Sequence, residues 1–209
     1  MTGLRQRQAQ EREARILRAS ESLFSRKRGY GRTSMREIAK RSRLAVGTLY
    51  NYFPSKPEIL LAIVARDTIE GLTAAEKVLK HPPRDPVRAV EMLIEQAMAP
   101  YVTHGRELWR QLIAAAMTDL ELAEGVFRAD VSLIGLLSAL LVALQARGDL
   151  RDGVEPGRAA IALYSAFFTW FFAYLANDSV ELDDLREELR ETIQLIMHGL
   201  LAPHTGEST

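Results

Sequence analysis

The 209-residue chain contains no cysteine and few aromatic residues, which make up 7% of it. The absence of cysteine excludes disulfide bonds, thiolate metal sites and a cysteine nucleophile. The histidines lie on separate segments without the spacing of a metal site: His81, His104, His198 and His204. A phosphate-binding loop, a dinucleotide fingerprint and a nucleophile elbow are also missing. The sequence therefore predicts a protein that is not an enzyme and that uses no metal ion or cofactor.

The N-terminus is polar and basic, which does not fit a signal peptide, and no apolar run is long enough and well placed for a membrane span. These absences predict a soluble cytoplasmic protein with no membrane partner. At 47% hydrophobic residues the chain can bury a sizeable core, and its length fits one or two domains.

The net charge of zero is the sum of two parts of the chain whose net charges have opposite signs. Residues 1–56 hold 14 Lys and Arg against 4 Asp and Glu, a net charge of +10, whereas the other 153 residues hold 13 against 23, a net charge of −10. A basic N-terminal quarter indicates a nucleic-acid-binding region, with a solvated basic helix as the alternative. Residues 1–10 form a basic arm, expected to be disordered alone and to follow the backbone or minor groove of bound DNA.

Residues 33–56 have the pattern of a helix-turn-helix. Ser34 and Glu37 are spaced as a capping box for a helix that ends near Arg41. A second short helix is predicted over 46–53. Its residues sort into an inward arc of Leu49, Phe53, Val46 and Tyr50 and an outward arc of Gly47, Asn51, Thr48 and Tyr52. The outward arc is uncharged but rich in hydrogen-bonding groups, which favours a helix laid in the major groove.

This stretch resembles the DNA-binding domain of TetR-type transcriptional regulators. Residues 33–39 read TSMREIA and residues 47–56 read GTLYNYFPSK. They match the family pattern T-[ST]-hydrophobic-R-[DE]-I-A followed by G-T-L-Y-x-Y-F-x-[ST]-K. Two positions depart from the pattern. Arg43 stands where the family usually has a turn glycine, and Ala45 replaces the Ser or Thr cap of the recognition helix, which costs about 1 kcal/mol.

The resemblance implies that the protein binds a double-stranded DNA operator. It assigns phosphate contacts to Thr48, Tyr50 and Lys56, and a base or phosphate contact to Arg36. Residues expected to face the bases are Val46, Gly47, Asn51 and Tyr52. The alternatives are a place in the core for Val46 and Tyr50, and simple solvation for Arg36.

The remainder of the chain is predicted to be helical, without strand-like alternation or repeats. Besides a first helix that ends near residue 27, helices are expected over 56–80, 87–103, 107–118, 125–147, 158–176 and 182–201. The predicted fold is all-α. It consists of an N-terminal three-helix helix-turn-helix domain over residues 1–55 and an antiparallel helical effector-binding and dimerisation domain over residues 56–209.

The last two predicted helices carry more apolar surface than one chain can cover. They are expected to form half of a four-helix dimer interface, where TetR-type proteins dimerise, and a buried core helix is the alternative. The interface candidates are Ala162, Ser165, Ala166, Thr169, Trp170, Ala173, Leu189, Ile193, Ile196 and Leu200.

TetR-type proteins typically release DNA when a small molecule enters a cavity among the middle helices. The candidate lining residues are mostly apolar, which predicts a hydrophobic or amphipathic effector: Met98, Tyr101, Trp109, Met117, Phe127, Tyr164 and Phe168. Plain core packing is the alternative for each. The expected function is a ligand-responsive repressor that binds a palindromic operator as a homodimer. The competing hypothesis is a helical binding module whose helix-turn-helix does not read sequence.

Overall fold

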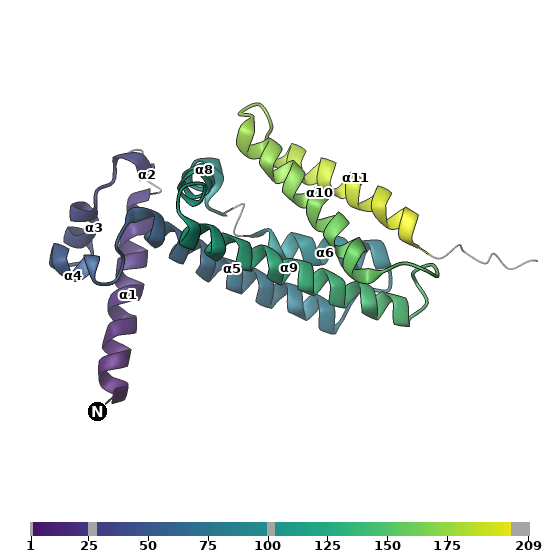
Figure 1. The fold of residues 1–209 in the computed structure, drawn as a ribbon, viewed down its shortest axis with the longest axis horizontal. Helices are drawn as coiled ribbons and strands as arrows, with labels where there is room; N and C mark the ends of the chain where they lie inside the picture. Colours follow the sequence, from purple (N-terminus) through teal and green to yellow (C-terminus); the bar gives the residue numbers. More distant parts are fainter. Residues whose placement is uncertain (1, 25–28, 100–102, 202–209) are drawn as a thin grey trace, which may run out of the picture. The chain divides into compact units, whose positions relative to one another are not determined.

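The computed structural model of the protein describes residues 2–24, 29–99 and 103–201, and over these ranges the chain is built from helices (Figure 1). One isolated β-bridge, between Leu150 and Leu201, is the only pairing of extended backbone there. The all-α prediction is confirmed. With the labels of Figure 1, the helices are α1 (Thr2–Phe24), α2 (Gly29–Arg32), α3 (Met35–Arg41), α4 (Val46–Tyr50), α5 (Lys56–Lys80), α6 (Pro86–Ala97), α8 (Gly105–Ala116), α9 (Leu120–Ala146), α10 (Pro156–Ala176) and α11 (Leu182–Leu200).

Two of the long helices begin in the same way, with an acidic N-cap followed by proline. The Asp85 carboxylate accepts a 2.9 Å hydrogen bond from the Val87 amide at the start of α6. Glu155 accepts from two amides at the start of α10 in the same manner. Proline suits the first helical position because the N–H that it lacks would have no helical partner. These caps place the helix starts within two residues of the predicted ones.

The N-terminal part differs from the prediction in three ways. Residues 2–10 belong to α1 and do not form a disordered arm, because Leu, Arg, Gln and Ala make up most of the segment and all favour helix. The expected end of the first helix, near residue 27, lies outside the described residues. The short helix α2 was not predicted, and α4 ends at Tyr50, three residues before the predicted end.

The chain divides into two compact units. The first consists of residues 1–66 and 107–126, and the second of residues 67–106 and 127–209. The predicted boundary at residues 55 and 56 stays a prediction. The compact units place the first half of α5 and most of α8 with the helix-turn-helix.

The first unit is held together by a buried apolar core and by two polar braces on α1. The core contains Ile16, Ile38, Leu49 and Ile59, each fully buried. One brace is an ion pair in which the guanidinium of Arg66 on α5 lies 2.5 Å from the carboxylate of Glu21. In the other, Arg41 on α3 donates a 2.8 Å hydrogen bond to the hydroxyl of Ser22. Both braces fix α1 against the helices that follow it.

In the second unit α10 packs along α11, and α6 packs against α11 (Figure 1). Two arginines form contacts that hold the loops of this unit in place. Arg147 donates to the carbonyl oxygens of Pro83 and Arg84, at 3.1 and 3.0 Å. Arg106 lies 4.2 Å from the centroid of the Tyr174 ring and donates to Asp178 at 3.1 Å. These contacts satisfy loop groups that have no helical partner.

Two helices, α9 and α10, are long and apolar enough to cross a membrane by length and composition. The expectation that no apolar run is long enough was therefore wrong on that criterion. Core helices of soluble proteins meet the same criterion, and the inner face of each helix is packed within the second unit, as the burial of Leu137, Leu140 and Phe167 shows.

Candidate nucleic-acid interface and ligand cavity

The capping box predicted at the start of α3 is confirmed. The Ser34 hydroxyl accepts a hydrogen bond from the Glu37 amide at 3.2 Å, and the Glu37 carboxylate accepts one from the Ser34 amide at 2.9 Å. At the other end of α3 the buried hydroxyl of Ser42 donates to the Ile38 carbonyl oxygen at 2.8 Å. With both ends satisfied, α3 forms a fixed support for the turn.

The turn between α3 and α4 carries both departures from the TetR-type pattern, and each has the expected effect. Arg43 adopts a left-handed backbone with φ +54°, where glycine would be unstrained. Ala45 is the N-cap of α4 and provides no side-chain hydrogen bond to the helix. The Leu44 amide closes the turn by donating to the Ala39 carbonyl oxygen at 2.9 Å.

On α4 the structure separates the residues that pack from those that face solvent. Leu49 is fully buried and Phe53, just beyond the helix, is 7% exposed, as predicted. Val46 and Tyr50 are 37% and 48% exposed, so their assignment to the inward arc was wrong. Because α4 has only five residues, it packs on the core through one buried side chain, Leu49, and its neighbours on the arc, Val46 and Tyr50, stay exposed to solvent. The remaining candidates divide by exposure, with Gly47 and Asn51 exposed and Thr48 and Tyr52 half-buried.

Lys56, a predicted phosphate contact, lies against Tyr30. Its ammonium donates a 2.9 Å hydrogen bond to the Tyr30 carbonyl oxygen and lies 4.5 Å from the centroid of the ring. Burial lowers the pKa of Lys56 from its ordinary value, and the nearby carboxylate of Glu37 partly opposes this. Burial also raises the pKa of Tyr30 to about 12. An ammonium has three N–H groups, so Lys56 keeps donors for a phosphate.

The surface of the helix-turn-helix is strongly basic. Arg36 is exposed on α3, as a contact with DNA requires. Further exposed cations of the first unit are Arg12, Arg15 and Arg18 on α1, Arg32 on α2, Lys40 and Arg41 on α3, and Arg43 in the turn. Such a concentration of positive charge attracts the phosphate backbone of nucleic acids.

The predicted effector-contacting residues lie in different environments. Met98 is buried and lines a cavity between α6 and α11, and Trp109 is buried on α8. Met117 and Phe127 are 81% and 63% exposed, which does not fit the wall of an enclosed site. On α10, Tyr164 is half-buried and Phe168 is exposed. Tyr101 lies outside the described residues.

The cavity between α6 and α11, called here the α6–α11 cavity, has a volume of about 500 Å³. Its lining combines apolar with charged residues: Glu91, Ile94, Glu95, Met98, Ala99, Thr103, Arg186, Leu189, Arg190 and Ile193. Apart from Met98, none of these was predicted as a ligand contact. The sequence does contain a pattern that indicates charged lining residues of this cavity. Arg186 and Arg190 stand one helical turn apart on α11 and lie on either side of the apolar Leu189.

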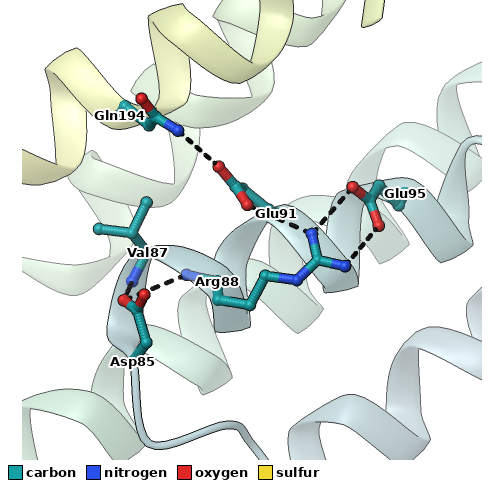
Figure 2. Close-up of polar contacts among 6 residues, drawn as sticks. All are labelled: Asp85, Val87, Arg88, Glu91, Glu95 and Gln194. Carbon is teal, nitrogen blue, oxygen red and sulfur yellow. Dashed lines mark hydrogen bonds and ion pairs between the residues drawn. The ribbon is translucent and has the colours of Figure 1, made fainter.

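A polar network on α6 borders this cavity (Figure 2). Glu91 is only 8% exposed, and each of its carboxylate oxygens has a partner. Gln194 of α11 donates to one oxygen at 3.1 Å, and Arg88 donates to the other at 3.2 Å. Arg88 also donates to both carboxylate oxygens of Glu95, at 3.1 and 3.4 Å. The acidic groups of α6 are therefore already bound by the protein.

The dimer candidates on α10 and α11 do not all lie on the open face. Ala162, Ser165 and Thr169 are exposed. Five others are half-buried: Ala166, Trp170, Ala173, Ile196 and Leu200. Leu189 and Ile193 are buried and line the α6–α11 cavity, where α6 packs against α11 within one chain, which does not favour a place in the interface; the interface assignment stays a prediction. Large apolar residues that do stand exposed on the two helices are Ile161, Phe168, Phe172 and Leu195.

One carboxyl group of the second unit is perturbed. Asp130 on α9 is half-buried and accepts a hydrogen bond from Tyr164. Burial raises the pKa of Asp130 from 3.8 to about 6, although the bond from Tyr164 opposes the rise. The Tyr164 ring lies 6.1 Å from the ring centroids of both Phe167 and Phe168.

Comparisons with known proteins agree with this geometry. The family model described as "Bacterial regulatory proteins, tetR family" matches residues 16–63. The HTH-type transcriptional repressor KstR of Rhodococcus jostii is 29% identical over 187 residues, which are 90% of this chain and 83% of that protein. The HTH-type transcriptional regulator UidR of Escherichia coli is 23% identical, over 94% of this chain and 96% of its own. Among solved structures, Thermus thermophilus FadR, described as a TetR-family transcriptional repressor in complex with lauroyl-CoA, has a TM-score of 0.71 at 26% identity, covering 94% of this chain and 99% of its own.

Proposed function

We propose that this chain, whose residues 16–63 match the tetR family of bacterial regulatory proteins, is a cytoplasmic, ligand-responsive repressor that binds a palindromic operator as a homodimer. The observation that carries the proposal is the exposed arc of α4. Gly47 and Asn51 are exposed, and Arg36 is exposed on α3, the helix that packs against α4. Glycine permits close approach of the backbone to DNA, and an Asn side chain can pair with adenine.

A homodimer follows from the apolar surface left open on the last two helices. Phe172 is 55% exposed on α10 and Leu195 is 75% exposed on α11, beside small residues that allow another helix to approach closely. A second copy of the pair would cover this surface in a four-helix arrangement. Two helix-turn-helix units related by a twofold axis would then read half-sites about 34 Å apart.

A small molecule that enters the second unit is the proposed effector. The α6–α11 cavity provides about 500 Å³, a size common among small-molecule sites. Relatives support regulation of this kind, since KstR is named as a repressor and the FadR structure contains lauroyl-CoA. A partly apolar effector fits the apolar share of the lining, which includes Ile94, Met98 and Leu189. The protein acts by binding, and we propose no catalysed reaction.

The test is selection of bound sequences from a random DNA pool with the purified full-length protein. We expect a palindrome whose half-sites are about one helical turn apart. Binding to this sequence should weaken steeply with salt, yet exceed binding to unrelated DNA by about a thousandfold or more. Asn51→Ala should relax the preference at defined positions at a cost of about 1–3 kcal/mol. Asn177→Ala, an exposed amide of the second unit, is the matched control and should leave the preference unchanged.

Recovery of no consensus, together with equal binding to all duplexes, would contradict the proposal. That result would favour the competing hypothesis of a helical binding module whose basic helix-turn-helix does not read sequence. A consensus that lacks twofold symmetry would retain the DNA reader and overturn the homodimer.

A further inference from the structure

We propose that the α6–α11 cavity binds an amphipathic organic anion, with its charged head on Arg190 and its apolar body against the floor of the cavity. The inference rests on the proposed function, since it names the chemical class and the site of the effector. The cavity lies within the second unit, and most of its lining residues belong to the helices α6 and α11. Sites on helices hold their ligand contacts more firmly than sites on loops.

The floor of the cavity is apolar. Ile94 comes from α6, Met98 is the C-cap of that helix, and Leu189 and Ile193 come from α11. Each is at most 5% exposed, so these side chains are held by core packing and present only a small part of their surface to the cavity. Water against such a floor finds few hydrogen-bond partners, and a hydrocarbon chain that displaces it removes apolar surface from water.

Arg190 lines the cavity and contributes a positive charge that is available to a ligand. In the part of the chain that the structure describes, its side chain has no hydrogen bond and no ion pair. Arg186, one turn earlier, donates to Asp183 at 2.9 Å, a carboxylate that is itself 90% exposed. A guanidinium presents paired N–H groups that match the oxygens of a carboxylate or a phosphate. Arg190 is therefore available to an incoming anion.

The acidic side of the cavity does not offer a matching site for a cation. The oxygens of Glu91 and Glu95 are occupied by Arg88 and Gln194, as Figure 2 shows. A cationic ligand would compete with the Arg88 guanidinium, which already offsets part of the negative charge of the two carboxylates through charge-assisted hydrogen bonds. An anion at Arg190 displaces nothing. The arrangement thus selects for the sign of the ligand's charge.

The experiment is calorimetric titration of the full-length protein, free of DNA, with ten-carbon probes that differ only in the head group: decanoate, decyl phosphate, decanol and decyltrimethylammonium. We expect the two anions to bind more tightly than decanol and the cation to bind weakest. The tighter of the two anions identifies the head group as carboxylate or phosphate. Arg190→Gln should weaken the anions by about tenfold and leave decanol unchanged. Arg128→Gln, an exposed arginine of α9 outside the cavity lining, removes the same charge and should change neither.

A second variant tests the location without touching a charge. Ala99 lines the cavity and is exposed, so Ala99→Trp should fold normally and reduce the binding of all ten-carbon probes. Anion binding that survives both Arg190→Gln and Ala99→Trp would overturn the inference, as would decanol binding as tightly as decanoate. Because the titration contains no DNA, it is independent of operator binding. An anion that binds at Arg190 without weakening operator binding would confirm the site and contradict its role as effector site.

Discussion

The ammonium of Lys56 donates a 2.9 Å hydrogen bond to the Tyr30 carbonyl oxygen while it lies 4.5 Å from the centroid of the same residue's ring. The first residue of α5 is thereby attached to α2, the short helix that precedes the helix-turn-helix. A lysine proposed to bind phosphate is thus already positioned before DNA arrives, and less side-chain entropy is lost on binding.

Replacement of this lysine should affect both stability and DNA binding. Lys56→Met removes the hydrogen bond and the cation–π contact, and we expect a loss of about 1 kcal/mol in the free energy of unfolding. Operator and random DNA should be weakened alike, and the slope of affinity against salt should fall by about one. Urea denaturation and DNA titration over a salt series measure the two effects. Lys56→Arg keeps the charge, and an unchanged salt slope in Lys56→Met would contradict a phosphate contact.

Strain at the turn can be relieved by one substitution. Arg43 has φ +54°, and glycine adopts this conformation without the steric cost of a Cβ atom. We expect Arg43→Gly to stabilise the protein by about 0.5–1 kcal/mol in thermal unfolding, after the greater freedom of glycine in the unfolded chain is subtracted. Arg43→Ala removes the same charge but keeps the Cβ atom, so it serves as the control. Equal stabilisation by both variants would show that charge, and not backbone strain, is the cause.

The pKa of Asp130 predicts a dependence of stability on pH. The folded state raises this pKa from 3.8 to about 6, so it holds the proton more tightly than the unfolded chain. The resulting stabilisation is complete below pH 3.8 and is lost as the pH rises through 6. The full rise corresponds to at most about 3 kcal/mol, and we expect roughly half of that because the carboxyl group is partly exposed.

Asp130→Asn cannot ionise, and its amide oxygen can still accept from Tyr164. The stability of this variant relative to the native protein should therefore increase by about 1.5 kcal/mol between pH 4 and pH 7. Denaturation in guanidinium chloride at several pH values measures this difference. Asp152→Asn, at an exposed carboxylate, is the control. A difference that does not vary with pH would contradict the raised pKa.

The proposed dimer depends on the exposed apolar face of α10. Phe172→Glu places a charge in the middle of that face and should raise the dissociation constant of the homodimer by at least about thirtyfold. Sedimentation equilibrium measures this constant directly. Ile69→Glu changes a residue of α5 that is 65% exposed, and it should leave the dimer intact. Dissociation by Ile69→Glu but not by Phe172→Glu would move the interface away from the last two helices.

Local signals in the sequence predicted most of the fold. Helix starts depend on neighbouring residues, as in the capping box of Ser34 and Glu37, and such pairs can be read without a structure. The residue at which a helix ends also depends on a local signal, often a single glycine. Gly148, with φ +82°, follows α9 as expected. The burial of Leu49 and the exposure of Gly47 and Asn51 also follow from helical periodicity alone.

The parts that were missed depend on contacts between distant residues. Periodicity shows that Leu189 and Ile193 lie on an apolar face, but it does not show whether α6 or a second chain covers them. Likewise, the bond between Gln194 and Glu91 joins residues 103 positions apart, and no local pattern reports it. The α6–α11 cavity arises where two such faces meet imperfectly, so it could not be located from either helix alone.

The guanidinium of Arg147 bonds to carbonyl groups 64 and 63 positions earlier in the chain, and this separation bears on the order in which the protein folds. Contacts that close so long a loop are costly to form early, because the entropy of the intervening segment must be lost first. We therefore expect the Arg147 contacts to form after the transition state. Their loss would hasten unfolding and leave the rate of refolding nearly unchanged. On this expectation, the arginine would lengthen the lifetime of the native state without making the protein fold faster.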